Sequence, residues 1–179
     1  MRFHILVFLG ALTVAQAQVI EQTQPLTGGS PGHFSTETSD TLNTPFVDDF
    51  SYRIDKPSPG LWSDQDVWVN DAMPLYQNSI GVATFDGCNG YGKPYQPGNT
   101  ATNGISDQLT SQYINLQGAT DVWLSFQYQR AGRGEVPSSS DSLVVSFYSP
   151  ADSTWTQVWG EKGTGNPDAF KTAMIPVLG

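Results

Sequence analysis

Alternation of apolar and polar residues is the feature that most constrains the fold of this chain. It runs through DVWLSFQYQ (121–129) and again through DSLVVSFYS (141–149). Because successive side chains of a β-strand point to opposite faces, this period of two predicts strands with one buried face. The residues on the predicted buried faces are Val122, Leu124, Phe126 and Tyr128 in the first segment, and Leu143, Val145 and Phe147 in the second.

The other candidate elements are also short and extended. No window sustains the i, i+3, i+4, i+7 pattern of an amphipathic helix without a Gly, Pro or β-branched interruption. Short strands separated by turn residues, each with one apolar face, predict an all-β fold, an antiparallel β-sandwich of jelly-roll type. We expect the further strands within 44–52, 66–70, 80–85, 106–116, 154–159 and the final segment KTAMIPVLG.

The first 17 residues have the pattern of a secretory signal peptide. Arg2 is followed by the apolar run ILVFLGALTV and then by Ala15-Gln16-Ala17, an A-x-A cleavage site. The apolar run is too short to span a bilayer comfortably. We therefore expect cleavage after Ala17, an exported protein and no membrane insertion once the signal is removed.

Residues 18–44 differ in composition from the rest of the mature chain. They are rich in Thr, Ser, Gly and Pro and show neither helical nor strand periodicity, so we expect a flexible leader. The folded domain is then predicted to span 45–179. Because the sequence ends inside a strand-like segment, and a sandwich of this kind pairs late strands with early ones, we expect the domain to be incomplete at its C-terminal end.

Cysteine content indicates how the fold is stabilised, and net charge indicates which kinds of partner are excluded. Cys88 is the single cysteine, so it cannot form an internal disulfide, and stability must come from a packed core. The formal net charge is −9 and no basic patch is present, which argues against nucleic acid and anionic membrane surfaces as partners. We expect the partner to be an extracellular protein or a glycan.

The glycine-rich stretch IGVATFDGCNGYGKPYQPG (80–98) invites three interpretations: a phosphate loop, a thiol site or a turn. Its glycines give GxxGxG, not the GxGxxG of dinucleotide-binding folds, and no helix comes after it to hold phosphate. Cys88 has no evident activating base, since His33 lies in the leader, and one Cys with one His cannot complete a zinc site. We interpret the stretch as a connector whose glycines supply positive φ.

The acidic residues form no recognisable catalytic pair. Glycoside hydrolysis on a β-sandwich needs two carboxylates across a cleft, and the four Glu residues include no strand-borne pair. Adjacent Asp48 and Asp49 would point in opposite directions on a strand. We therefore predict no catalytic residue and no enzyme activity within this sequence. Asp residues at predicted strand edges, where Asp ordinarily makes turns, are Asp86, Asp107, Asp121 and Asp141.

Structural calcium is the one cofactor for which the sequence offers ligands. Hard oxygen donors from Asp side chains and loop carbonyls suit this ion. Asp48 or Asp49, with Asp64 or Asp66, would supply them, although no EF-hand spacing supports the site. Asp48, Asp49 and Asp66 are therefore the candidate metal ligands, and no other cofactor is expected.

Two of the five tryptophans are candidates for stacking on sugars. Trp123 falls on the side of its predicted strand opposite Leu124 and Phe126, and so outside the expected core. Trp68 lies in the predicted strand 66–70. Most tryptophans in a chain of this size are buried or half-buried, so core packing is the competing interpretation for both.

Several motifs occur here in an order typical of one known family. They are PFVDDFSY (45–52), GVATFDG (81–87), LSFQYQRAGRGEVP (124–137) and DSLVVSFYS (141–149). In this order they resemble the N-terminal jelly-roll domain of large exported surface proteins of Bacteroidota, which are type IX secretion or gliding-associated substrates. More distantly they are similar to MAM and laminin-G-like jelly rolls. The resemblance covers about residues 45 to 177.

The resemblance implies a jelly roll whose last strands come after residue 179. It also implies recognition by the secretion machinery through a C-terminal sorting region that these residues do not include. It carries no catalytic residues to this sequence.

The leading functional hypothesis is a noncatalytic β-sandwich module of an exported protein, outside the cell or on its outer-membrane surface, that serves adhesion or protein–protein interaction. Loops 86–105 and 131–140 would form its variable contact edges. The alternative is a carbohydrate-binding module that stacks sugars on exposed Trp or Tyr. A third hypothesis is an accessory domain of a secreted hydrolase encoded downstream.

Overall fold

The regular structure of this protein is built from β-strands. A computed structural model describes residues 2–10, 41–52, 55–95, 97, 103–164 and 166–177, and no helix occurs among them. This confirms the predicted all-β fold. The strands are β1 (Arg2–Gly10), β2 (Leu42–Asn43), β3 (Trp68–Asn70), β4 (Val82–Thr84), β5 (Asn103–Thr110), β6 (Ile114–Asn115), β7 (Trp123–Tyr128), β8 (Ser142–Ser149), β9 (Thr154–Lys162) and β10 (Lys171–Pro176).

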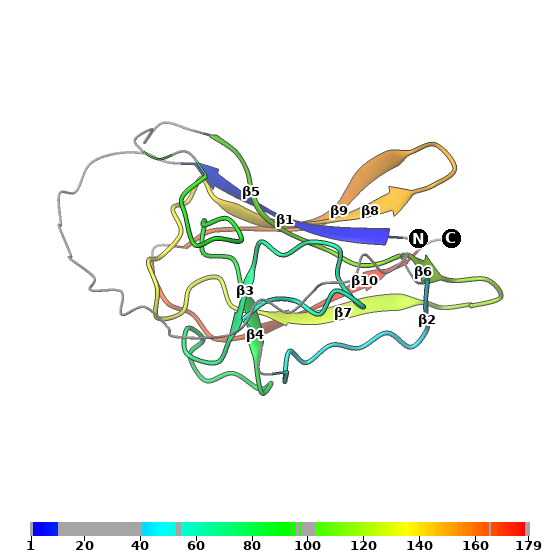
Figure 1. The fold of residues 1–179 in the computed structure, drawn as a ribbon, viewed down its shortest axis with the longest axis horizontal. Helices are drawn as coiled ribbons and strands as arrows, with labels where there is room; N and C mark the ends of the chain where they lie inside the picture. Colours follow the sequence, from blue (N-terminus) through cyan, green and yellow to red (C-terminus); the bar gives the residue numbers. More distant parts are fainter. Residues whose placement is uncertain are drawn as a thin grey trace.

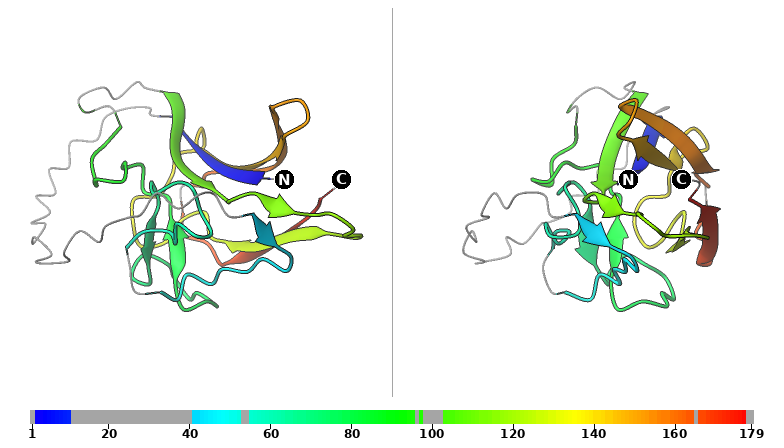
Figure 2. Two further views of the ribbon diagram at one scale, coloured as in Figure 1. Left: turned by 45° about the vertical axis from the view of Figure 1, so that its right-hand side comes forward. Right: turned by 90° about the vertical axis from the view of Figure 1, so that its right-hand side faces the viewer.

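One four-stranded sheet dominates the fold and is accompanied by three strand pairs. The sheet has the order β5-β1-β8-β9, with antiparallel neighbours throughout (Figure 1). β7 pairs with β10 and β3 with β4, both antiparallel, while the two-residue strands β2 and β6 run parallel. The tip of the β8–β9 hairpin bends away from the β7–β10 pair, as Figure 1 and Figure 2 show.

β1 occupies the place between β5 and β8. Its residues were expected to belong to a removable signal peptide, yet the backbone of Arg2–Gly10 pairs with both neighbours. Ile5 lies opposite Leu109 of β5 on one side and opposite Val145 of β8 on the other. Ala17 lies outside the described residues, so cleavage after it stays a prediction.

Most predicted strands coincide with observed ones. The segments 121–129, 141–149, 66–70 and 80–85 contain β7, β8, β3 and β4, and the final segment contains β10. β9 begins with the predicted segment 154–159 and continues three residues beyond it, while the segment 106–116 covers most of β5, which begins at Asn103, and all of β6. β2 begins before residue 45, inside the predicted leader, whose residues 18–40 lie outside the described part of the chain.

The strand predicted over 44–52 is wrong. Asp48 and Asp49 accept hydrogen bonds from the backbone N–H groups two residues ahead, those of Phe50 and Ser51, at 2.8 and 3.0 Å. Phe50 has a φ of 52°, which no strand residue adopts. Because Asp side chains offer the backbone this local alternative to a ladder, the segment turns instead of pairing.

The core lies between the four-stranded sheet and the strand pairs. Leu109 of β5, Val145 of β8 and Val67 before β3 are almost completely buried at its centre. Trp159 of β9 meets the rings of Phe126 and Tyr128 on β7 edge-on, with centroids 5.2 and 4.9 Å apart. The alternation along β7 is as predicted, with Leu124, Phe126 and Tyr128 half-buried and the residues between them exposed.

Alternation is less complete along β8. Val144, Val145, Ser146 and Phe147 are all buried, so both faces of the strand centre are covered. β8 has a hydrogen-bonded neighbour on each side, β1 and β9, and is therefore an interior strand of the sheet. The phase predicted for Val145 and Phe147 is correct, and both belong to the central core cluster.

Candidate functional site

The outer surface of the β7–β10 pair is the most prominent candidate for binding. It carries three cross-strand pairs, which we call the Trp123 face: Trp123 opposite Pro176, Ser125 opposite Met174, and Gln127 opposite Thr172. All six residues are exposed. Trp123 is 54 % and Met174 64 % accessible, high values for side chains of this size and polarity.

The Trp123 face is firmly supported from below. Ala173 and Ile175, which alternate with its β10 residues, are buried in the core. Leu124 and Phe126 of β7 pack against the same core cluster. Since directly opposed side chains in an antiparallel pair lie about 5 Å apart, Trp123, Pro176 and the diagonal Met174 form one apolar patch.

Polar groups border this patch on the β7 side. Gln127 accepts a hydrogen bond from the Asn78 side chain at 3.2 Å through its Oε1, and it lies opposite Thr172 of β10. The face therefore offers an exposed indole next to hydrogen-bonding groups.

Trp68, the second predicted stacking residue, lies elsewhere. It belongs to β3, is half-buried and pairs with Thr84 of β4. The structure thus places the two tryptophans on separate strand pairs, and only Trp123 is strongly exposed.

Asp48, a predicted metal ligand, serves as a hydrogen-bond acceptor for the core. Its Oδ2 accepts the indole N–H of Trp62 at 2.6 Å and the hydroxyl of Tyr52 at 3.0 Å, and its Oδ1 accepts the Phe50 N–H. Trp62 is buried and stacks on Phe50 with ring centroids 6.0 Å apart. The PFVDDF motif is therefore a loop that closes one end of the core.

The other two predicted ligands have different surroundings. Asp49 is exposed, and hydrogen bonds from Ser51 hold its pKa below the usual value. Burial, followed by the charge of Asp64, raises the pKa of Asp66. Among the described residues, no three His, Cys, Asp or Glu side chains lie close enough together to hold a metal ion.

Calcium binding at Asp48, Asp49 and Asp66, with Asp64 as the alternative to Asp66, therefore stays a prediction. Within the described structure, the buried Oδ2 of Asp64 and Oε1 of Gln65 have no hydrogen-bond partner. Lys56 lies beside them and donates to the Gln65 carbonyl at 2.9 Å, supplying positive charge at the same place. Thermal melting with and without millimolar calcium tests the prediction.

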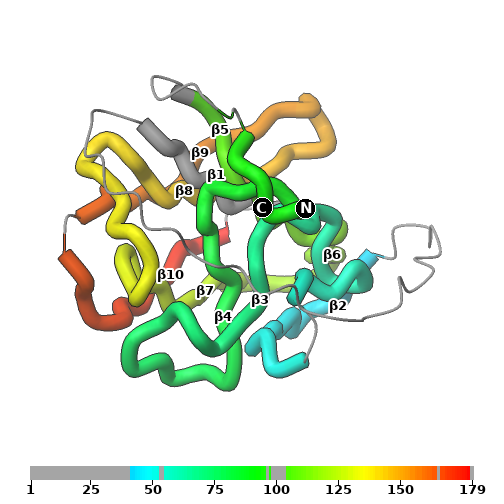
Figure 3. The backbone as a smooth tube through the Cα atoms, turned by 60° about the vertical axis from the view of Figure 1, so that its left-hand side comes forward, coloured from blue at the N-terminus to red at the C-terminus, as the bar shows by residue number. Residues whose placement is uncertain are grey.

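The glycine-rich connector is anchored by a buried carboxylate. Asp107 was expected at a strand edge, but it lies inside β5 with no exposed surface. It accepts hydrogen bonds from the Gly87 N–H and the Tyr95 hydroxyl, so the green trace that rises from β4 toward β5 in Figure 3 is tied to the sheet. Gly87 and Gly92 have φ of 74° and 69°, as the turn interpretation predicted.

Cys88 has the properties of a structural thiol. It is half-buried and unpaired, and its backbone bridges to Pro94 across the connector. Burial raises the pKa of the thiol, and the negative charges of Asp86 and Asp107 raise it further. Because the thiolate is the reactive form, these surroundings disfavour nucleophilic chemistry at Cys88.

A cluster of opposite charges, absent from the sequence-based expectations, joins β7, β9 and β10. Arg130 donates through Nε to Asp168 at 2.7 Å and lies 3.3 Å from Glu161. Lys171 contacts the same two carboxylates at 3.4 and 3.5 Å and lies over the Tyr128 ring. No local motif signals this cluster, because Arg130 and Asp168 are 38 residues apart.

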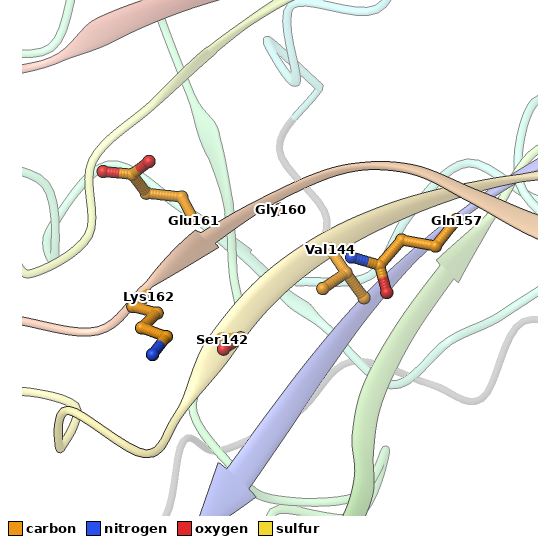
Figure 4. A pocket seen from close by; sticks show the side chains of 6 residues that line it. All are labelled: Ser142, Val144, Gln157, Gly160, Glu161 and Lys162. Atoms are coloured by element: carbon orange, nitrogen blue, oxygen red, sulfur yellow. The ribbon is translucent and has the colours of Figure 1, made fainter.

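A small hollow lies between β8 and β9. Its volume is about 220 Å³, below the roughly 300–1,000 Å³ of typical small-molecule sites. Figure 4 shows Gln157 and Val144 close together on one side of the strand pair, while the Glu161 side chain extends away from them. The hollow is lined by Ser142, Val144, Gln157, Gly160, Glu161 and Lys162.

Comparisons of the chain with protein-family models, with curated proteins and with solved structures find no match. Within the described residues, there is also no helix of the length and apolarity needed to cross a membrane.

Proposed function

We propose that this chain is a noncatalytic binding module of an exported cell-surface protein, and that it contacts an extracellular protein partner through the Trp123 face. The observation that carries the proposal is the exposure of Trp123 and Met174, diagonal neighbours on a strand pair whose opposite face is buried. Trp and Met are enriched in protein interfaces, whereas an apolar patch of this kind is unfavourable on a surface that stays in water.

The rigidity of the site supports binding by preformed complementarity. The β7–β10 pair is held by the core on its inner face and by the Arg130 charge cluster at the Tyr128 end. Ordering a flexible loop on binding costs free energy, and a surface made of paired strands avoids much of that cost. Export, a jelly-roll architecture of the MAM or laminin-G-like type and type IX secretion belong to the same proposal, and the sequence motifs support them.

Carbohydrate binding is the second candidate function, and the polar border of the patch favours it. Trp123 offers a flat ring, while Gln127, Thr172 and Asn78 offer hydrogen-bonding groups on the same face. An aromatic platform beside such groups suits a sugar ring, which has an apolar face and a rim of hydroxyls.

A parallel screen separates the two candidates. The full chain is applied to a glycan array and to a panel of purified extracellular matrix and cell-surface proteins. We expect a protein ligand whose binding is lost in Trp123→Ala and retained in Trp155→Ala, which alters another exposed tryptophan, on β9. Submillimolar sugar binding that depends on Trp123 would instead establish the carbohydrate function. Binding to either panel that is unchanged in Trp123→Ala would contradict both candidate functions of the Trp123 face.

A further inference from the structure

The place of β1 in the sheet conflicts with the predicted fate of its residues. The sequence assigns Arg2–Gly10 to a signal that is removed on export, whereas the fold uses the same residues as an internal strand. β1 is paired along most of its length with β5 and with β8. If the signal is removed, the mature molecule lacks β1. The four-stranded sheet then persists only if another strand takes the place of β1.

Loss of β1 would open the sheet at its most buried point. β5 and β8 are not paired with each other, so each would present an unpaired row of backbone N–H and C=O groups. The register puts Ile5 between Leu109 and Val145, which are 1 % and 0 % exposed. A gap here would bring water to the centre of the core, which costs free energy in proportion to the apolar surface uncovered.

The gap has a defined direction and length. β1 runs antiparallel to β5 and to β8, so β5 and β8 are parallel to each other. A strand that enters between them must therefore run antiparallel to both. The register with β5 shifts between Leu6 and Phe8, whereas the register with β8 is continuous from Arg2 to Phe8. A strand of about nine residues running in the direction of β1 satisfies both ladders.

We propose that the mature chain is a strand acceptor: the slot between β5 and β8 binds one extended, predominantly apolar strand of a partner polypeptide. Every strand described between residues 41 and 177 already has its own place in a sheet, so none of them supplies the occupant. A strand that follows residue 179 in the same polypeptide is the competing occupant, and the test distinguishes it from a partner strand. The inference rests on the export part of the proposed function and is independent of the Trp123 face.

The chemistry of the occupant can be inferred from that of β1. RFHILVFLG contains six large apolar residues and two polar ones near its start, and it seats in the slot by backbone pairing on both sides. Added strands of this kind gain affinity from main-chain hydrogen bonds and specificity from side-chain pockets. A partner strand rich in apolar residues, without Pro in its centre, therefore fits.

The test uses the full chain, folded first and opened afterwards. A protease site is inserted between Ala17 and Gln18, the predicted signal segment (residues 1–17) is cut from the folded protein, and a fluorescent peptide with the sequence of residues 2–10 is added. The control peptide carries Ile5→Pro and Leu6→Pro; because adjacent N–H groups of a strand point to opposite sides, it lacks one donor toward each neighbour. Hydrogen exchange of β5 and β8 amides is followed in parallel.

We expect saturable binding to the cut chain, at least about tenfold weaker binding of the proline peptide, and no binding to the uncut chain. Hydrogen exchange of the β5 and β8 amides should become faster after cutting and slower again when the peptide is added. The same result is expected if the cut chain unfolds and the peptide restores its fold. Trp123→Ala should bind the peptide normally. Equal binding of both peptides would overturn the proposal, and so would continued protection of the β5 and β8 amides once the signal segment has dissociated. So would N-terminal sequencing that finds Arg2 in the exported protein, or cross-linking in the exported protein that joins β5 and β8 to a segment of the same polypeptide after residue 179.

Discussion

Tyr95 donates its hydroxyl to Oδ1 of Asp107 at 2.9 Å, and this bond fastens an exposed loop to a carboxylate that has no contact with solvent. The second oxygen of Asp107 accepts the Gly87 N–H at 2.8 Å. One side chain inside β5 thus holds the glycine-rich connector at two points, Gly87 and Tyr95. A buried carboxylate is costly unless its oxygens are satisfied, and these two donors satisfy them.

The first prediction concerns pH. Burial raises the pKa of Asp107 to about 6, with Asp86 and Asp66 contributing to the rise, from the ordinary value of 3.8. The folded state therefore binds the proton more tightly than the unfolded chain, so stability falls as pH rises from about 4 to about 6. The loss amounts to at most about 3 kcal/mol.

Asp107→Asn should remove most of that pH dependence, measured by urea unfolding from about pH 4 to about pH 7. A smaller slope of the same sign should persist because burial also raises the pKa of Asp66. Asp71→Asn, which alters an exposed carboxylate, is the control and should leave the slope as it is. An unchanged slope in the Asp107 variant would show that this carboxylate is not the titrating group.

The second prediction concerns Asp48. Asp48→Ala leaves the buried Trp62 indole N–H and the Tyr52 hydroxyl without their acceptor, at a cost of about 2–3 kcal/mol in the free energy of unfolding. Asp49→Ala, next in the chain, removes only an exposed turn contact and should lower the free energy of unfolding much less than Asp48→Ala does. Similar losses in the two variants would contradict the anchoring role of Asp48.

The third prediction concerns the charge cluster. Arg130→Gln removes contacts to Asp168 and Glu161, whose side chains are only partly exposed, and we expect a measurable loss in the free energy of unfolding. The loss should shrink in high salt, because screening weakens the same contacts in the wild-type protein. Arg133→Gln, on the exposed loop, is the matched control. Chemical denaturation by urea, which leaves ionic strength unchanged, measures both.

The fourth prediction concerns close backbone approach at Gly81. A Cβ at this position would collide with the carbonyl of Phe50, which is backbone and cannot rotate away. Gly81→Ala should therefore destabilise the protein by about 2 kcal/mol or more. At Gly104 of β5 a Cβ would meet no atom within 4 Å, so Gly104→Ala should be nearly neutral. Equal melting temperatures for the two variants would contradict this packing.

Local patterns predicted the parts of the fold that depend on local geometry. The phase of β7 placed Leu124 inside and Trp123 outside from the period of two alone, and the structure agrees. The segment around Asp48 was mispredicted as a strand because its apolar and polar spacing resembles one. Two consecutive Asp side chains instead hydrogen-bond the backbone and turn it.

Contacts between residues far apart in the sequence are not signalled by any local pattern. Asp107 meets Tyr95 and Gly87 from 12 and 20 residues away, so its burial inside β5 gave no local signal and it was mistaken for a turn residue. The apolar run at the start of the chain is ambiguous in another way. The residues that make an export signal also satisfy the centre of a sheet, and composition does not distinguish the two.

The measurement that bears most directly on the proposed function is the ratio of dissociation constants for the ligand found in the screen. It compares Trp123→Ala with the wild-type chain and takes Trp155→Ala as reference. We predict binding at least about tenfold weaker for the Trp123 variant and within about twofold of wild type for the Trp155 variant. Equal affinities for the Trp123 variant and the wild-type chain would contradict the assignment of the β7–β10 surface as the binding site.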